Sequence, residues 1–104
     1  MFGTGLRTRV LLALFLLKES HAAELARILG AGATTIRNAL DTLEEARIVG
    51  GVMEGNTRRV RLEPRFYAYD ELNALLEKMA LADSALLDAV TKLRRRPRRR
   101  GKEL

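Results

Sequence analysis

The chain has 104 residues and a mass of 11.6 kDa, the size of one domain. A hydrophobic content of 47% and a charged content of 31% are typical of a folded globule and exclude a disordered or fibrous chain. The sequence contains no cysteine and one histidine, which excludes disulfides, thiolate metal sites and cysteine nucleophiles. This composition suits a reducing compartment, and we expect the protein in the cytoplasm.

The net charge of +6 is concentrated at the end of the chain. Residues 94–104 contain seven basic residues and one acidic residue, whereas residues 1–93 carry equal numbers of both. A block of like charge beside Pro97 and Gly101 is typical of an unfolded segment that binds a polyanion. We therefore predict a disordered tail over residues 96–104. The basic residues of this end of the chain are Arg94, Arg95, Arg96, Arg98, Arg99, Arg100 and Lys102.

The first predicted element is a helix over Leu6 to Leu17 that is apolar on every side. Its uninterrupted apolar run, residues 10–17, is far shorter than the roughly 20 residues that span a bilayer, so no membrane is expected. One face can cover the domain core. Because so small a domain has no second core, we expect the face with Leu11 and Phe15 to pack on a partner subunit.

Two further helices follow, over residues 22–29 and about 33–47, with Gly30 closing the first of them. In the second, the apolar residues Ile36, Leu40 and Leu43 have helical spacing. A rotation of 100° per residue then directs a polar face outward. This face consists of Thr34, Asn38, Asp41 and Glu45, with Arg37 beside it.

A hairpin is predicted next, with strands over Ile48–Met53 and Arg58–Leu62 around a turn centred on Gly55 and Asn56. On the returning strand, Val60 and Leu62 take one face and Arg59 and Arg61 the other. Pro64 ends the pairing because it has no N–H to donate.

From Asp70 onward, apolar residues recur at alternating spacings of three and four, which is typical of a helix that packs on another helix. Asp83 is the one charge in this series. Two structures are open: one bent or interrupted helix that ends near Arg95, which we favour, or a second helix capped by Asp83. A monomer seldom exposes so large an apolar patch, so we predict a homodimer. Its predicted interface is Leu11, Phe15, Leu72, Leu76, Met79, Leu86, Val90 and Leu93.

This order of elements is that of a winged helix-turn-helix: mainly α, with a small β-hairpin wing and a C-terminal dimerisation helix. We place the DNA-binding core in residues 1–65, the dimerisation helix in 66–95 and the tail in 96–104. The stretch ELARILGAGATTIRNALDTLEEARIVGGVMEGNTRRVRLEP resembles the core of ArsR-like and MarR-like regulators. The segments MFGTGLRTRVLLALF and FYAYDELNALLEKM also resemble winged-helix regulators encoded beside nucleotidyltransferases. The resemblance covers about Phe2 to Met79.

The resemblance implies a base-reading face of Thr34, Thr35, Arg37, Asn38 and Asp41. The chemistry agrees, since arginine pairs with guanine, asparagine with adenine, and an aspartate accepts from cytosine. The wing arginines Arg58, Arg59, Arg61 and Arg65 are suited to phosphates or the minor groove.

The sequence departs from the family pattern in two places. Arg47 replaces the glycine that usually ends the recognition helix, so this end must be strained or differently built. The cysteine pair of metal-sensing members is absent and His21 has no companion ligand, so we predict no metal site.

The sequence thus predicts a sequence-specific regulator that binds double-stranded DNA, a repressor acting as a homodimer on a palindromic operator. Two alternatives are open: a module that binds a protein partner, such as a nucleotidyltransferase, or an architectural nucleic-acid binder that depends on the tail. No arrangement of residues suggests catalysis, and no cofactor is expected.

Overall fold

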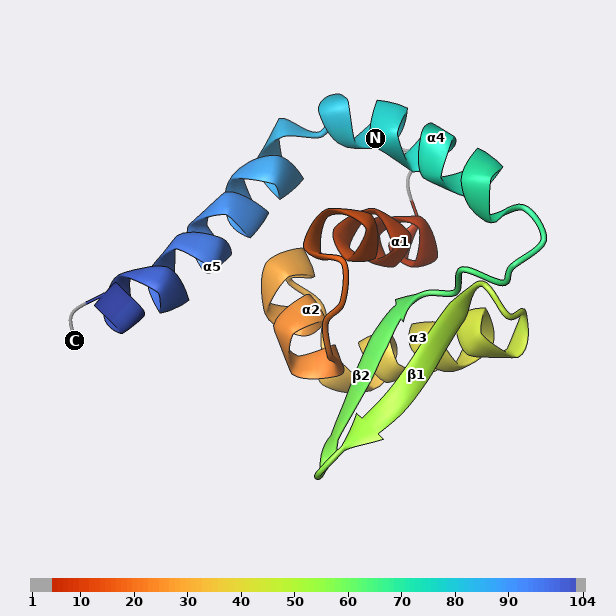
Figure 1. Ribbon diagram of the computed structural model, residues 1–104, viewed down its shortest axis with the longest axis horizontal. Coiled ribbons are helices and arrows are strands. Elements are labelled where there is room, and N and C mark those ends of the chain that lie inside the picture. Colours follow the sequence, from red (N-terminus) through yellow and green to blue (C-terminus); the bar gives the residue numbers. More distant parts are fainter. Residues whose placement is uncertain (1–4, 103–104) are drawn as a thin grey trace.

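The computed structural model describes the backbone of residues 5–102 and the side chains of residues 5–93. The elements follow in the predicted order, a mainly α fold with one antiparallel hairpin (Figure 1). They are α1 (Leu6–Leu17), α2 (Ala22–Leu29), α3 (Ala33–Glu45), β1 (Val49–Glu54), β2 (Thr57–Leu62), α4 (Tyr69–Leu81) and α5 (Ser84–Lys102).

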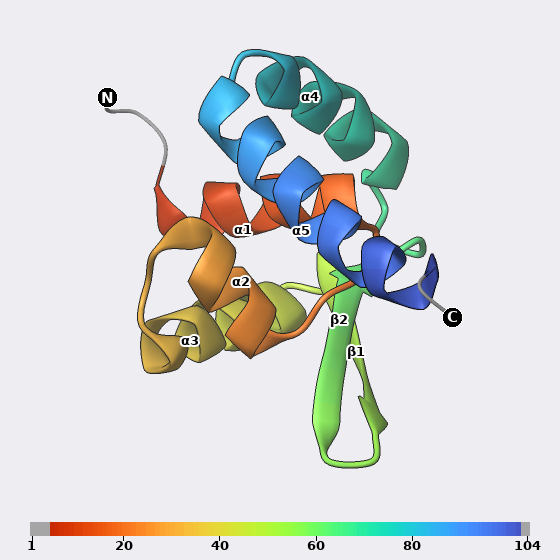
Figure 2. The same ribbon diagram turned by 90° about the vertical axis from the view of Figure 1, so that its left-hand side faces the viewer.

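Helix α1 lies at the centre, between two layers (Figures 1 and 2). Helices α2 and α3 pack on one side of it, and α4 with the first part of α5 on the other. Both faces of α1 are buried, since Val10 and Leu12 point in opposite directions and are 0% and 2% exposed. The expectation that a partner subunit covers the second face is therefore corrected. The chain's own C-terminal helices cover it, and Leu11 and Phe15 are half-buried against the same core.

The two helices of the helix-turn-helix end where the sequence provides the right residues. Gly30 ends α2 in the left-handed conformation (φ 67°), which a glycine adopts without steric cost. Gly32 is the N-cap of α3. Ile36 and Leu40 of α3 are fully buried beneath α1 and α2, which fixes the opposite face of α3 toward solvent.

The end of α3 shows the strain that the sequence predicted at Arg47. This residue has φ 64°, a left-handed conformation that is costly for a side chain with a Cβ. Its N–H donates to the carbonyl oxygen of Glu44, and the N–H of Ile48 donates to that of Leu43, at 2.9 and 3.0 Å. These two bonds form a Schellman ending, so an arginine occupies the usual position of glycine.

The wing is a hairpin whose base is bonded to the helical core. Val49 pairs with Leu62 at the base and Glu54 with Thr57 at the tip, so each strand lies one residue from its predicted start or end. Ser20, in the connection before α2, exchanges two backbone hydrogen bonds with Val60, at 3.0 and 2.8 Å. The connection thus adds a one-residue third strand, which the sequence analysis did not predict.

The C-terminal segment forms two helices, the second of the two predicted alternatives. The carboxylate of Asp83 accepts a hydrogen bond from the N–H of Leu86 at 3.1 Å and caps α5, so this charge marks a break. Helix α5 continues to Lys102 instead of ending near Arg95, so residues 96–102 are helical where a disordered tail was predicted. Residues 103–104 of the predicted tail lie outside the described residues.

Candidate nucleic-acid interface

The outward face of α3 carries the predicted base-reading residues. Thr34, Thr35, Arg37, Asn38 and Asp41 are all exposed. A weak hydrogen bond of 3.5 Å joins the guanidinium of Arg37 to the hydroxyl of Thr34. Within the described residues, no hydrogen bond occupies the side-chain amide of Asn38. Its donor and acceptor are therefore free to meet a base edge.

Charge is distributed unevenly along this face. The first half of α3, residues 33–40, contains Arg37 and no acid. The second half contains Asp41, Glu44 and Glu45. The side chains of α3 alone therefore favour an anion at the start of the helix over one at its end.

A groove runs between α3 and the first turn of α1, mainly along the first half of α3. It has a volume of about 530 Å³. It is lined by Gly5, Leu6, Arg7, Thr8, Thr35, Asn38, Ala39 and Thr42, with no acid among them. Arg7 and Thr8 were not predicted to lie at this surface, because they precede an apolar run and only the fold brings them beside Asn38.

The wing arginines divide between the two faces of β2. Arg58 shares the face of Val60 and Leu62 and points toward α3, where it bonds to Asp41 and Glu44 at 3.0 and 2.6 Å. Burial alone would lower the pKa of Arg58, but the hydrogen bonds to these two carboxylates outweigh it and raise the pKa above its ordinary value.

The other wing arginines lie elsewhere. Arg59 bonds to Glu54 at 2.8 Å across the opposite face, and this hydrogen bond raises the pKa of Arg59. Arg61 is exposed on the same face as Arg59. Arg65 follows the strand, and its N–H donates to Glu63 at 3.1 Å, which lowers the pKa of that carboxyl group. The four arginines therefore do not form one patch.

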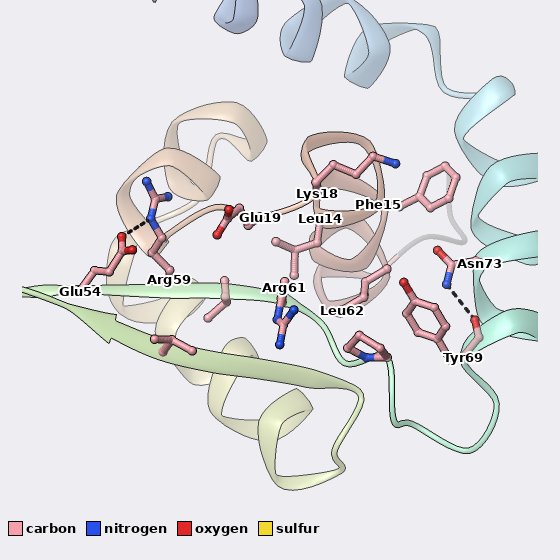
Figure 3. Close-up of a pocket in the computed structure, with 13 residues that line it drawn as sticks. Leu14, Phe15, Lys18, Glu19, Glu54, Arg59, Arg61, Leu62, Tyr69 and Asn73 are labelled. Atoms are coloured by element: carbon pink, nitrogen blue, oxygen red, sulfur yellow. Dashed lines mark hydrogen bonds and ion pairs between the residues drawn. The ribbon is translucent and has the colours of Figure 1, made fainter.

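A second cleft, of about 480 Å³, separates the outer face of the wing from α1 and α4 (Figure 3). Its walls are apolar where Leu14, Phe15 and Leu62 reach it. Lys18 and Arg61 bring positive charge to the cleft, Glu19 brings negative charge, and Glu54 and Arg59 neutralise each other. The cleft contains both apolar and charged groups, and the sequence alone did not reveal it because three separate segments form it.

Most residues of the predicted dimer interface pack against the core of the same protomer. Leu76, Leu86 and Val90 are 1%, 5% and 6% exposed and pack on the chain's own core, which corrects their assignment to a partner contact. Leu72, Met79 and Leu93 are half-buried. The most exposed leucines of this region are two that the heptad pattern omitted, Leu75 at 55% and Leu81 at 75%.

The remaining predictions concern groups that the structure does not describe or contain. The side chains of Arg94 to Lys102 lie outside the described residues, although their backbone continues α5. Among the described residues, no cluster of His, Cys, Asp or Glu is arranged to hold a metal ion. In the same part of the chain, no helix has the length and hydropathy to cross a membrane.

Comparison with known proteins gives one result for the fold. No protein-family model matches the sequence, and no curated protein matches it. Among solved structures, the chain is similar to the adhesin competence repressor AdcR from Streptococcus pyogenes, with a TM-score of 0.56 and 13% sequence identity. The match covers 86% of this chain and 76% of that one. The similarity of fold and the observed order of elements together establish a winged helix.

Proposed function

We propose that this protein is a DNA-binding transcriptional regulator that reads base sequence with α3. The observation that carries the proposal is the first half of α3, where Arg37 and Asn38 are exposed and residues 33–40 include no acid. Thr34 and Thr35 on the same turn complete a surface of donors and acceptors suited to base edges and phosphates. The fold supports this assignment, because a winged helix presents this helix to the major groove.

The phosphate contacts that we propose flank this surface. Arg7 and Thr8 lie across the groove from Asn38, in position to contact the backbone of a duplex that α3 enters. Arg61 is the wing arginine for which we propose a phosphate contact. Arg65 lies just beyond the strand. It is held to Glu63 only by its backbone N–H and a 3.5 Å ion pair, so its side chain is free to contact a phosphate as well.

The basic end of α5 adds a contribution that does not depend on base sequence. Seven cations over residues 94–102 steepen the salt dependence of binding, by a slope of about 0.9 for each phosphate neutralised. We propose that this segment raises affinity for any duplex, while α3 discriminates between duplexes.

We further propose a homodimer that acts as a repressor on a palindromic operator. Three of the apolar groups still accessible on α4 lie within about 60° of one another around the helix, namely Leu72, Leu75 and Met79. This stripe adjoins the side of α4 that packs on α1, and a second copy of the chain would cover it. The similar structure, AdcR, is itself named as a repressor.

The test of the proposed function is selection of bound duplexes from a random DNA pool at near-physiological salt. We expect a palindrome with half-sites about 10 base pairs apart. The variant Arg37→Ala with Asn38→Ala should lose the motif. The control Arg27→Ala, an exposed arginine on α2, should keep it. Enrichment without a motif, or no retained DNA, would refute sequence reading by α3.

The dimer has its own test. Leu75→Glu places a charge in the apolar stripe without touching the core, because Leu75 is 55% exposed. We expect sedimentation analysis to show a dimer for the native protein and a monomer for Leu75→Glu. The control Glu77→Lys, on the same helix, should remain dimeric. A monomeric native protein would contradict the proposal.

A further inference from the structure

Strand geometry separates Arg58 from the other arginines of the wing. Alternate residues of a strand point to opposite faces, so Arg58 lies on the side of Val60 and Leu62, which pack on the core. Arg59 and Arg61 lie on the other side. Arg58 is therefore held between the hairpin and α3 and does not extend from the wing toward solvent. Its side chain is 29% exposed, against 89% for Arg65.

The guanidinium of Arg58 binds two carboxylates of α3 at once. One Nη atom lies 3.0 Å from Asp41 Oδ1 and 2.6 Å from Glu44 Oε1. Asp41 and Glu44 are three residues apart, so they project from the same side of the helix. These are the carboxylates that would otherwise present negative charge to a phosphate backbone at the end of the recognition surface.

Gly51 provides the space in which this cluster forms. Gly51 pairs with Val60 across the hairpin and so shares the α3-facing side with Arg58. A Cβ at this position would collide with Glu44 Oε2. The carboxylate of Glu44 thus reaches Arg58 by passing over a position without a side chain.

We propose that Arg58 is a positioning residue and not a DNA contact: it holds the wing at a fixed angle to α3 and neutralises Asp41 and Glu44. This inference rests on the proposed function for its effect on DNA, but the arrangement itself exists without DNA. It also removes Asp41 from base reading, because its carboxylate is engaged by Arg58.

A cycle of substitutions distinguishes this role from a phosphate contact. We compare Arg58→Ala in the native background with Arg58→Ala in a background of Asp41→Asn and Glu44→Gln, using the palindromic duplex recovered by selection. In the native background, Arg58→Ala leaves two carboxylates unpaired beside the DNA, and we expect a loss of affinity of at least about threefold. In the neutral background, the same substitution should change affinity less than twofold.

A phosphate contact would behave differently. Its loss would persist in the neutral background and would reduce the salt slope of binding by about 0.9. Either observation for Arg58→Ala would overturn the proposal. Arg61→Ala serves as the comparison, since we propose a phosphate contact there and expect that reduction of slope.

The glycines of β1 provide a second, charge-free test. Gly51→Ala moves the Glu44 carboxylate away from Arg58 but leaves the bond between Arg58 and Asp41, so it should cause part of the affinity loss of Arg58→Ala. Gly50→Ala introduces the same methyl group on the opposite face, where it displaces the carboxylate of Glu63 instead, and should leave the Arg58 cluster unchanged. Equal affinities for the two alanine variants would overturn the proposal.

Hydrogen exchange of the wing amides, measured without DNA, separates this proposal from the proposed function. We expect faster exchange in β1 and β2 for Arg58→Ala and Gly51→Ala than for Arg61→Ala and Gly50→Ala. If the native protein binds no DNA, the proposed function fails while this measurement still decides the positioning role. Equal exchange in all four variants would overturn that role.

Discussion

The helix-turn-helix unit with its wing, residues 5–65, and the C-terminal pair α4 and α5 are both rich in apolar residues, but they use them differently. In the first region, the apolar residues at helical spacing in α3 are buried, as Ile36 and Leu40 illustrate. In the second, Leu76 is buried while Leu75, one residue away, is 55% exposed. A periodic pattern shows which side of a helix is apolar. It does not show whether the same chain or another one covers that side.

The largest expected effect is a difference in stability between alanine substitutions at two neighbouring leucines of α4. Leu76→Ala removes a side chain that is 1% exposed and leaves a cavity against α1, so the free energy of unfolding should fall by about 2 to 5 kcal/mol. Leu75→Ala should change it by less than about 0.5 kcal/mol in the monomer. Urea denaturation, at a protein concentration at which sedimentation shows a monomer, measures both. Similar losses for the two would mean that α4 does not pack as described.

A second experiment tests whether sequence discrimination and salt-dependent affinity come from different regions of the chain. Arg37→Ala and Asn38→Ala should each cost about 1 to 3 kcal/mol of discrimination between the selected operator and a scrambled duplex. Deletion of residues 94–104 should weaken binding to both duplexes equally and flatten the salt dependence. Titrations at several salt concentrations measure these quantities. If the deletion removed the discrimination between the two duplexes, residues 94–104 and not α3 would provide the sequence specificity.

The break between α4 and α5 depends on Asp83. Asp83→Ala removes the cap on the N–H of Leu86 and should lower the free energy of unfolding by about 1 kcal/mol. Faster amide exchange should be confined to the start of α5, and α3 should be unaffected. Asp83→Asn is the control, because asparagine caps a helix about as well as aspartate. A loss of stability in both variants would point to the charge of Asp83 instead of its cap.

The smallest expected effect is an increase in stability, from a substitution in the helix-turn-helix unit. Arg47→Gly relieves a side chain held at φ 64° while keeping the Schellman hydrogen bonds. The free energy of unfolding should rise by about 0.5 to 1 kcal/mol, reduced in part by the greater entropy of the unfolded glycine. Arg27→Gly, within α2, is the matched control and should instead destabilise by about 1 kcal/mol. A loss at both positions would mean that the arginine stabilises this end of α3.

Local chemistry made the first region predictable. The spacing of Ile36 and Leu40, the left-handed Gly30 and the strain at Arg47 all follow from residues within one or two turns. The strands, too, lie within one residue of their predicted positions. In the candidate site, the exposed face of α3 follows from periodicity alone, which is why the exposure of Arg37 and Asn38 could be predicted.

Contacts between distant segments were not predictable in the same way. Arg58 reaches Asp41 across 17 residues, and the groove joins Arg7 to Asn38 across 31. Strand alternation placed Arg58 opposite Arg59, but only the fold shows that the α3-facing side has two carboxylates to receive it. The burial of Leu86 and Val90 depends likewise on α5 folding back over α1, which no local pattern specifies.

The hydrogen bonds between Ser20 and Val60 attach the wing to the helical core near its base. The hairpin is held at this point and, two residues further along β2, by the bonds of Arg58 to α3, and the strand from Val60 to Asn56 is about 13 Å long, of which the part beyond Arg58 has only its own pairing for support. A tilt of a few degrees at the attachment to Ser20 displaces the tip in proportion to that length, whereas the same tilt hardly moves α3. Since this attachment belongs to the connection between α1 and α2, any force that shifts α1 against α2 is magnified at the tip of the wing.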